Sequence, residues 1–423
     1  MDTHRDIDLV VVGLGYVGLP LARGATRAGL RVVGLDRSER VVEQLNQGRS
    51  HVDDISDQEV AEMRAAGFAA TVDSAVIADA RAVVICVPTP LTEHGAPDLT
   101  AVDGAVAAIA ANLRPGTLVV LESTTYPGTT EDVVRPVLEA GGLKAGVDFH
   151  LAFSPERIDP GNPHFGLENT PKVVGGCTTA CTKAARELYE RFVGEVVEAK
   201  DTRTAEMAKL LENTYRHVNI ALVNEMAMFC REIGVDLRDA IRCASTKPFG
   251  FAPFHPGPGV GGHCIPIDPN YLSYKVRSLG IPFRFVELAQ EINQRMPLHV
   301  VQRAADLLND RGLAVRGSKV LLIGVTYKAD IADQRESPAL AVAAELLRRG
   351  AELSYYDANV PAWSVGGRPV PRAEDCAAAA AEADLAVLLQ PHRDIDLVEL
   401  ADRARMLFDT RGAAAGHPQV VQL

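Results

Sequence analysis

The sequence has little that is typical of a membrane segment, and we expect no secretion signal in it. No apolar run reaches the roughly 18–20 uninterrupted residues that span a bilayer, since even the Ala-rich stretch around Cys376 is broken by Glu382 and Asp384. The polar residues 1–8 precede an apolar run that carries glycines at fixed spacing instead of a small-residue cleavage site. We therefore interpret that run as a first strand, and we expect a cytoplasmic protein with no membrane partner.

The sequence also lacks an excess of basic residues. It has 43 Lys and Arg against 55 Asp and Glu, which gives a formal net charge of −12 over 423 residues. Because nucleic-acid binding depends on clustered Lys and Arg, we expect no nucleic-acid partner. Apolar residues at 47% and charged residues at 23% exclude a disordered, collagen-like or disulfide-scaffold chain. The length predicts two or three domains.

Cysteine is too scattered for a disulfide framework. The chain has seven, an odd number spread over its whole length. Cys177 and Cys181 form a lone C-x-x-x-C without a second pair of ligands, so we expect no metal site. Six of the seven are interpreted as packing residues.

What the sequence does contain is an alternation of β-branched runs with Ala-rich helical stretches, which predicts parallel strands with helices on both faces. In the first part of the chain the runs lie at 9–12, 31–35, 82–87 and 117–121, with further candidates near 149–153 and 172–174. A second such unit follows at 319–324, 337–349 and 352–357, with more strands at 385–389 and 406–409. Gly350 is the expected C-cap of the helix at 337–349.

Between these two parts the apolar period becomes helical. Residues 206–233 contain no Pro or Gly and predict a long spine helix, and a helical pattern returns at 285–311. The Gly/Pro-rich stretch 247–269 is interpreted as an ordered, functional loop. The predicted fold class is α/β, with two Rossmann-like doubly wound parallel-sheet domains joined by a central helical region. The predicted domains are 1–200, 201–312 and 313–423.

A dinucleotide motif follows the first strand. Gly13, Gly15 and Gly18 form G-x-G-x-x-G between strand and helix, and Asp36 ends the next strand. The glycines permit a tight turn, approach of a pyrophosphate to the backbone, and close packing of helix on strand. Asp36 would bind the adenosine ribose and repel a 2′-phosphate, which favours NAD over NADP. Arg37 could serve such a phosphate, but a surface charge or an adenine platform is the preferred interpretation.

The most glycine-dense segment surrounds a cysteine. Cys264 follows Gly261, Gly262 and His263, and leads to Asp268. With little side-chain cover its sulfur would be open to substrate, and His263 and nearby amides could lower its pKa, as a nucleophile requires. The alternative is a buried cysteine in a glycine-rich turn.

Polar residues at other predicted element ends complete the candidates. Lys209 and Asn213 lie four residues apart on one face of the spine helix, where they could hold a reacting group or be surface residues. Ser154-Pro155-Glu156-Arg157 and the segment from Glu122 to Thr129 each follow a predicted strand, where open α/β sheets bind ligands. The hydroxyl residues could instead simply end the strand.

Together these motifs resemble those of the UDP-glucose/GDP-mannose dehydrogenase family of nucleotide-sugar dehydrogenases, in order from about residue 7 to Arg411. The matching segments are the glycine motif with Asp36, Val87-Pro88-Thr89-Pro90, Ser123-Thr124, Ser154-Pro155-Glu156, Lys209-Leu210-Leu211-Glu212-Asn213, Gly261-Gly262-His263-Cys264 through Asp268, Gly324-Val325-Thr326-Tyr327-Lys328, and Asp333-Gln334-Arg335-Glu336-Ser337-Pro338.

The resemblance implies an NAD-dependent four-electron oxidation of a sugar C6 alcohol to a carboxylate. Asp268, or a water held by Lys209, would take the hydroxyl proton. Cys264 would capture the aldehyde as a thiohemiacetal and then carry a thioester, which water positioned by Glu156 and Thr124 would hydrolyse. Lys209 and Asn213 would stabilise the oxyanion.

The resemblance also implies binding residues and a partner. The cofactor would meet Gly13, Gly15, Tyr16, Val17, Gly18, Asp36, Arg37, Thr89 and Thr124. The UDP-sugar would meet Glu156, Arg157, Lys209, Asn213, Gly261, Tyr327, Lys328 and Arg411. A homodimer or larger homo-oligomer is implied, with residues 247–255 reaching a neighbour's site, and a role in polysaccharide biosynthesis fits the family.

One position departs from the UDP-glucose branch. Where that branch has a second acid, this chain has Pro160, and the adjacent Asp159 is not assigned the role. The segments 154–162 and 246–251, with the cysteine loop, resemble more closely the branch acting on UDP-N-acetylhexosamines, particularly UDP-N-acetylglucosamine. UDP-N-acetylmannosamine and UDP-glucose remain alternatives.

Two other functions fit these residues less well. A two-electron β-hydroxyacid dehydrogenase would need neither Cys264 nor a second α/β domain. A catalytically silent sensor of NAD or nucleotide sugar would have no use for Cys264, Lys209, Glu156 and Asp268 together.

Overall fold

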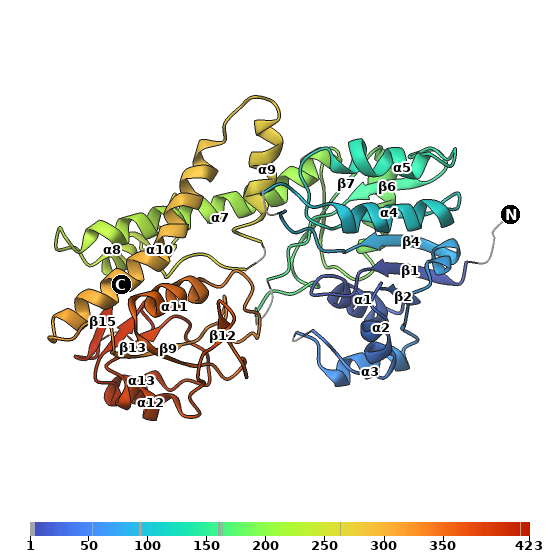
Figure 1. The fold of residues 1–423 in the computed structure, drawn as a ribbon. Helices are drawn as coiled ribbons and strands as arrows, with labels where there is room; N and C mark the ends of the chain where they lie inside the picture. The colour runs from blue at the N-terminus through green and yellow to red at the C-terminus, as the bar shows by residue number, and fades with distance from the viewer. Residues whose placement is uncertain are drawn as a thin grey trace. The chain divides into compact units, whose positions relative to one another are not determined.

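The computed structural model describes residues 5–52, 54–92, 95–159, 162, 164–262, 264–414 and 416–423. It divides the chain into two compact units, each formed from two stretches of sequence (Figure 1). The first unit contains residues 1–212 and 270–281, and the second contains residues 213–269 and 282–423. The predicted division at residues 200 and 312 stays a prediction, since these units are a coarser partition.

The first unit is built on an eight-stranded sheet of order β3-β2-β1-β4-β5-β6-β7-β8, in which only the β6–β7 pair is antiparallel. Its strands are β1 (Ile7–Val12), β2 (Val32–Leu35), β3 (Ala69–Thr71), β4 (Ala80–Ile85), β5 (Leu118–Leu121), β6 (His150–Phe153), β7 (Lys172–Gly176) and β8 (Val196–Glu198). Its helical segments are α1 (Gly18–Arg27), α2 (Glu39–Asn46), α3 (Asp57–Ala65), the 3-10 turn η1 (Ser74–Asp79), α4 (Thr100–Asn112), the π-helical η2 (Thr130–Val134), α5 (Arg135–Glu139) and α6 (Thr179–Tyr189).

Both faces of this sheet are buried. On β1, Leu9 and Val11 pack into a core with α1, α2, α3 and α6, whereas Val10 and Val12 pack into a core with α4 and α5. Figure 1 shows α4 and α5 on one side of the sheet and α1 and α2 on the other. A strand covered on both faces reads as a continuous apolar run, which is why the runs were recognisable in the sequence. The predicted doubly wound α/β class is confirmed.

The second unit has a five-stranded, all-parallel sheet of order β10-β9-β13-β14-β15. The strands are β9 (Lys319–Ile323), β10 (Glu352–Tyr356), β13 (Leu385–Leu388), β14 (Leu407–Asp409) and β15 (Val420–Gln422), with a small hairpin of β11 (Ser364–Val365) and β12 (Arg368–Pro369). The helices of this region are α8 (Leu237–Ala244), α10 (Arg284–Asn309), α11 (Pro338–Arg349), α12 (Cys376–Glu382) and α13 (Leu397–Arg403).

This second sheet is also covered on both faces, because Val320 and Leu322 of β9 pack into one core and Leu321 and Ile323 into another. The predicted cap of α11 is confirmed: Gly350 has a φ of +91°, the left-handed conformation that glycine adopts without strain.

The spine helix is present as α7, Thr202–Cys230, a continuous helix of 29 residues. It begins and ends a few residues before the predicted bounds of 206 and 233. Of the described residues, none belongs to a helix both long enough and apolar enough to cross a membrane.

Helix α9, Asp268–Arg277, was not predicted from the sequence. It follows the glycine-rich loop, and the stretch 270–281 belongs to the first unit although it lies far along the chain. Its Tyr271 hydroxyl donates to the carbonyl oxygen of Thr89 at 2.6 Å. This bond ties the later stretch to the loop after β4.

Candidate active site

The turn after β1 has the close packing that a dinucleotide turn requires. Gly13 has a φ of +89°, and a Cβ there would lie 2.8 Å from the carbonyl oxygen of Cys86. A Cβ on Gly18 would lie 1.8 Å from the carbonyl oxygen of Gly13. At Gly15, in contrast, no described atom would come within 4 Å of an added Cβ. Gly13 and Gly18 are therefore required by close packing of the fold, whereas Gly15 leaves the backbone open just before α1.

Asp36 stands beside this turn at the end of β2. Its Oδ2 accepts the Leu14 N–H and its Oδ1 accepts the Ser38 N–H, both at 2.9 Å. The carboxylate is half-buried, so each oxygen keeps a lone pair for a ribose hydroxyl. Arg37 is exposed. Open backbone at a helix start beside an oriented carboxylate fits the pyrophosphate and ribose of NAD.

The other predicted cofactor residues lie around the carboxyl ends of β1, β4 and β5. Tyr16 and Val17 pack partly against the core under α1, with Val17 at the N-cap. Thr89 and Thr124 are half-buried. The Ser123 hydroxyl donates to the carbonyl oxygen of Val87 at 2.8 Å, which joins the two loops after β4 and β5.

Glu156 follows β6 and is buried. Its Oε1 accepts the Ile158 N–H, whereas Oε2 finds no hydrogen-bond partner among the described residues. A cavity of about 10 Å³ lies beside it, lined also by Arg157 and Lys172, and that volume suits one water. A carboxylate with one fixed and one unsatisfied oxygen can hold a water in a set orientation.

The residues that follow Glu156 are bonded to other groups or exposed. Arg157 pairs with Glu212 at 2.8 Å and donates to the Pro171 carbonyl oxygen at 2.6 Å. Asp159 is exposed and accepts from the Asn162 amide. Pro160, the position of the missing second acid, lies outside the described residues.

A buried charged cluster near Glu156 was missed by sequence analysis. Lys172 Nζ lies 2.9 Å from Glu122 Oε2, and the Tyr189 hydroxyl donates to the other oxygen of Glu122. Burial raises the pKa of Glu122, although Lys172 opposes the shift. Burial alone would lower the pKa of Lys172, but the charges of Glu122 and Glu156 outweigh it and raise that pKa. The only hint in the sequence was a lysine at the start of an apolar strand.

In the second unit the glycine-rich loop presents Cys264 at the entrance to α9. The Cys264 carbonyl oxygen accepts the N–H groups of Ile267 at 3.1 Å and Asp268 at 2.8 Å, and Cys264 is half-buried. Asn213 Nδ2 donates to Asp268 Oδ2 at 2.6 Å, with both side chains buried. The structure therefore joins two of the predicted catalytic residues. His263 lies outside the described residues.

Lys209 is buried on α7, one turn before Asn213, and so is not a surface lysine. The predicted catalytic residues are divided between the units. Thr124, Glu156 and Lys209 belong to the first, and Asn213, Cys264 and Asp268 belong to the second.

Of the predicted sugar and diphosphate residues, Tyr327 lies against the loop within the second unit. A Cβ added to Gly262 would lie 2.7 Å from the ring of Tyr327, and a Cβ added to Gly261 would lie 2.7 Å from the Cβ of Tyr327. Arg411 Nε donates to the Leu389 carbonyl oxygen at 2.8 Å. Burial and the nearby charge of Arg238 lower the pKa of Arg411 to about 10, so it stays a cation at neutral pH. Lys328 is half-buried.

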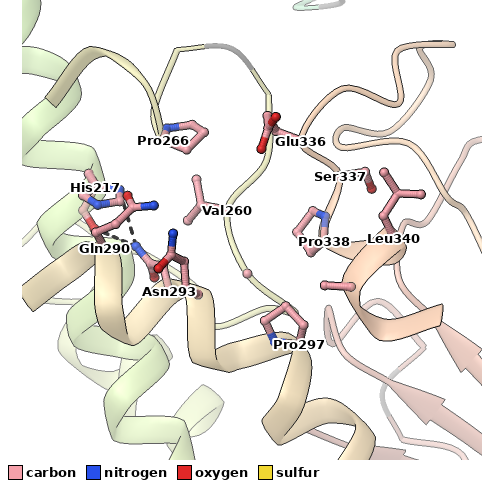
Figure 2. Close-up of a pocket in the computed structure, with 13 residues that line it drawn as sticks. His217, Val260, Pro266, Gln290, Asn293, Pro297, Glu336, Ser337, Pro338 and Leu340 are labelled. Atoms are coloured by element: carbon pink, nitrogen blue, oxygen red, sulfur yellow. Dashed lines mark hydrogen bonds between the residues drawn. The ribbon is translucent and has the colours of Figure 1, made fainter. Parts of the chain in front are cut away.

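A cavity of about 290 Å³ in the second unit was not anticipated (Figure 2). Its lining comes from α7, α10, the loop that carries Cys264, and the start of α11. His217, Gln290 and Asn293 form its polar side.

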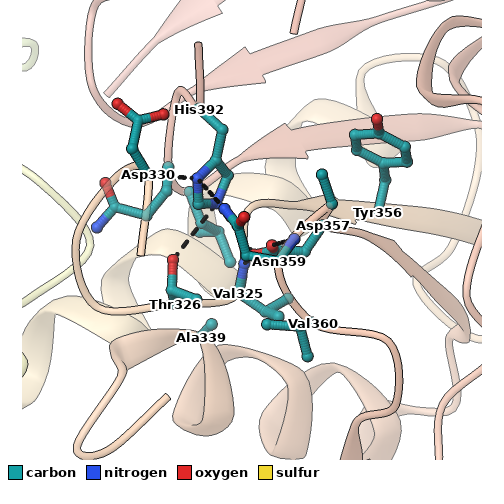
Figure 3. Close-up of polar contacts among 12 residues, drawn as sticks. Val325, Thr326, Asp330, Ala339, Tyr356, Asp357, Asn359, Val360 and His392 are labelled. Carbon is teal, nitrogen blue, oxygen red and sulfur yellow. Dashed lines mark hydrogen bonds and ion pairs between the residues drawn. The ribbon is translucent and has the colours of Figure 1, made fainter. Parts of the chain in front are cut away.

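Asp357, the acid at the end of β10, is hydrogen-bonded to neighbouring residues (Figure 3). Asp357 accepts the Val325 N–H at 2.8 Å, and its Oδ2 lies 3.0 Å from His392 Nε2. The Asp330 N–H donates to His392 Nδ1 at 2.9 Å, so Nε2 carries the hydrogen and donates to Asp357. Burial alone would raise the pKa of Asp357, but these hydrogen bonds outweigh it and lower the pKa.

Comparisons with known proteins agree with this geometry. Three models of the UDP-glucose/GDP-mannose dehydrogenase family match: the NAD binding domain at residues 7–193, the central domain at 203–295 and the UDP binding domain at 321–415.

Named relatives cover most of the chain. A UDP-N-acetyl-D-glucosamine 6-dehydrogenase of Pseudomonas aeruginosa is 36% identical over 363 residues, 85% of this chain and 84% of the relative. A UDP-N-acetyl-D-mannosamine dehydrogenase of Methanococcus maripaludis is 34% identical over 436 residues, 97% of this chain and 95% of the relative.

A solved UDP-D-ManNAc dehydrogenase of Pyrococcus horikoshii superposes with a TM-score of 0.88 at 31% identity, covering 98% of this chain and 99% of that one. The NAD fit of the first unit, the UDP binding match of the second and these relatives converge. The chain belongs to the UDP-glucose/GDP-mannose dehydrogenase family and is an NAD-dependent nucleotide-sugar dehydrogenase.

Proposed function

We propose that the protein oxidises the C6 hydroxyl of a UDP-2-acetamido sugar, with UDP-N-acetylglucosamine as the preferred substrate, to the uronate. The net reaction consumes the alcohol, two NAD and one water, and yields the carboxylate, two NADH and three protons. The observation that carries the proposal is the buried Asn213–Asp268 pair beside the glycine-rich loop of Cys264. Relatives named for both N-acetylglucosamine and N-acetylmannosamine substrates support the 2-acetamido class.

The chain's residues have the following roles in the proposal. Asp268, or a water on Lys209, takes the proton of the C6 hydroxyl. NAD, when bound, accepts the hydride of each oxidation step. Cys264 Sγ then bonds to the aldehyde carbon, and Lys209 and Asn213 stabilise the resulting oxyanion by about 3–4 kcal/mol for each good donor.

Release of the product needs water. Loss of the second hydride leaves a thioester on Cys264, and a water beside the unsatisfied Oε2 of Glu156, with Thr124, attacks it. The C–S bond breaks, the carboxylate leaves and the thiol is restored. Tyr327, Lys328 and Arg411 would hold the sugar and diphosphate, with Arg157 and Gly261 at the sugar.

Two further parts of the proposal concern organisation. We retain the three domains 1–200, 201–312 and 313–423.

A homodimer is supported by apolar side chains left exposed on α7 and α10: Tyr215, Leu222, Phe229, Phe285, Leu288 and Leu298. Light scattering should give twice the mass of 45.3 kDa or more, and a monomer would contradict this part.

The reaction is tested by supplying limiting UDP-N-acetylglucosamine, UDP-N-acetylmannosamine or UDP-glucose with excess NAD and counting NADH per sugar consumed. Two NADH per sugar is expected, with the N-acetylglucosamine compound oxidised fastest. One NADH with free aldehyde would contradict the thioester route, and none from any sugar would favour the sensor alternative. Cys264→Ser should lower carboxylate formation about 10³-fold or more, because a hydroxyl is a far weaker nucleophile, whereas a sensor would keep its ligand affinity.

A further inference from the structure

The cavity of Figure 2 is lined in part by the loop that carries Cys264 in the second unit. Val260 and Pro266, on either side of Cys264 in the sequence, both line it. His217 lies four residues after Asn213 on α7, and four residues of helix advance about 6 Å. The proposed catalytic face of α7 therefore continues directly into the cavity.

One residue of the cavity lining has a buried hydrogen-bond donor without a partner among the described residues. His217 is 1% exposed, and its Nε2 has no hydrogen-bond partner among the described residues. The donor state follows from a chain of contacts. The Gly257 N–H donates to Asn224 Oδ1 at 3.0 Å, and Asn224 Nδ2 donates to Asn293 Oδ1 at 2.9 Å.

These contacts orient Asn293 so that its Nδ2 faces His217 Nδ1 at 3.5 Å. His217 Nδ1 is therefore the acceptor, and Nε2 carries the hydrogen. Burial lowers the pKa of His217 to about 4, so the ring is neutral at physiological pH. A neutral, buried donor without a partner suits an uncharged acceptor such as an amide carbonyl.

The cavity also contains an acceptor without a partner and an apolar wall. Gln290 Oε1 is buried and unsatisfied among the described residues. Val260, Pro266 and Pro297 supply apolar surface. Glu336 is the one ionisable side chain besides the histidine among the described lining residues, and it would repel an anion. One donor, one acceptor and an apolar wall match the C=O, N–H and methyl of an acetamido group.

We propose that this cavity receives the 2-acetamido group of the sugar, with His217 Nε2–H donating to its carbonyl oxygen and Gln290 Oε1 accepting its N–H. The methyl packs against Val260 and Pro266. C2 lies across the pyranose ring from C5, which bears the reacting C6, so a site one helical turn beyond Asn213 is suitably placed. This inference rests on the proposed function and identifies the residues that select its substrate class.

The test compares two substitutions of one residue. In His217→Asn the side-chain oxygen can replace Nδ1 toward Asn293 but nothing replaces Nε2–H, whereas in His217→Gln an amide N–H can reach the Nε2 position. The readout is kcat/KM for UDP-N-acetylglucosamine divided by kcat/KM for UDP-glucose. His217→Asn should lower this ratio about 10–100-fold, because the acetamido carbonyl loses its partner in a buried site. His217→Gln should keep the ratio within about threefold of the wild type, since one hydrogen bond is retained.

A second pair of variants tests the proposed hydrogen bond to Gln290. Gln290→Met removes the acceptor at nearly constant volume, and Gln290→Glu keeps an acceptor. Only the first should lower the ratio, by about tenfold, the effect of one lost hydrogen bond in a buried site. Thermal unfolding of each variant shows which is folded, and a misfolded His217 variant leaves the Gln290 pair to decide.

The outcomes separate this inference from the proposed function. If the wild type prefers the 2-acetamido sugar but both Asn and Met variants keep the wild-type ratio, the cavity holds only water and the inference is wrong. If the wild type prefers UDP-glucose, the proposed substrate is wrong, and the inference that rests on it is overturned as well.

Discussion

The turn after β1 and the turn after β9 have the same backbone geometry but differ in what surrounds them. Gly13 follows β1 and donates its N–H to the Leu35 carbonyl oxygen at 2.8 Å; Gly324 follows β9 and donates to the Tyr356 carbonyl oxygen at 2.9 Å. Both glycines have positive φ, +89° and +75°. A side chain at either would collide with the carbonyl of a neighbouring strand's end.

The acids at the ends of the next strands also correspond. Asp36 accepts the Leu14 N–H, as Asp357 accepts the Val325 N–H. The two turns diverge in what faces each carboxylate. Asp36 is half-buried and open beside Gly15, whereas Asp357 is fully buried and bonded to His392.

This contrast separates the parts of a dinucleotide turn that serve the fold from the parts that serve the ligand. The first glycine and the acid that binds the turn's backbone are present in both turns, because each satisfies a structural demand. Open space over the second glycine is present only after β1. After β9, the corresponding loop carries Tyr327 and Lys328, which suit a sugar nucleotide better than a dinucleotide.

Removing the buried carboxylate of Asp357 should cost the most stability. Asp357→Ala should lower the free energy of unfolding of the second unit by about 3–5 kcal/mol, because several buried N–H donors lose their acceptor. Urea unfolding monitored by circular dichroism measures it. Asp36→Ala is the matched control and should cost about 1–2 kcal/mol, since water can reach its donors. Equal losses would contradict the comparison.

The shared glycine gives the next largest effect. Gly324→Ala should cost about 2–4 kcal/mol, since its Cβ would lie 2.3 Å from the Gln390 carbonyl oxygen at a positive φ. Gly15→Ala, with open space, should stay within about 0.5 kcal/mol of the wild type while weakening NAD binding. Thermal melts with and without NAD separate the two effects, and a destabilised Gly15 variant would argue against a ligand role.

The open acid should affect affinity more than stability. Asp36→Asn should raise KM for NAD by about 10–100-fold, since the charged acceptor of the ribose is lost. It should also narrow the preference for NAD over NADP, because the charge that repels a 2′-phosphate is gone. Initial rates with both cofactors measure this, and an unchanged NAD/NADP ratio would contradict the assignment.

The smallest effect is on acid sensitivity. Because the folded pKa of Asp357 lies below its unfolded value, its contribution to stability is present above the unfolded pKa of about 3.9 and is lost as pH falls through the folded pKa. Asp357→Asn should therefore flatten the decline in stability below about pH 4. Melting temperatures of both proteins from pH 6 to pH 3 would show parallel curves if the acid had no such role.

These two turns also show what could be predicted from sequence. The turn after β1 was predicted because its glycines are close together and its acid follows at a standard spacing. The closed acid was not, because His392 lies 35 residues from Asp357 and has no motif of its own. The Glu122–Lys172 pair, 50 residues apart, was missed for the same reason.

The same limit holds for the candidate site, where motifs could be predicted from the sequence but contacts between separate segments could not. The Asn213–Asp268 contact joins residues that the family resemblance had already named, whereas the cavity of Figure 2 is assembled from four separate segments, so no local pattern marks it. Helix α9 was missed because Asp268-Pro269-Asn270 reads as a turn, although proline is well tolerated in the first turn of a helix.

The return of residues 270–281 to the first unit has a consequence for the order of synthesis. A ribosome delivers all eight strands of that unit before it delivers Tyr271, whose hydroxyl closes on Thr89. Until that later stretch has been made, the loop after β4 has its bond to Ser123 but lacks its bond to Tyr271. A fragment that stops at residue 212 therefore contains every strand of this sheet but lacks the stretch 270–281 and its bond to Thr89.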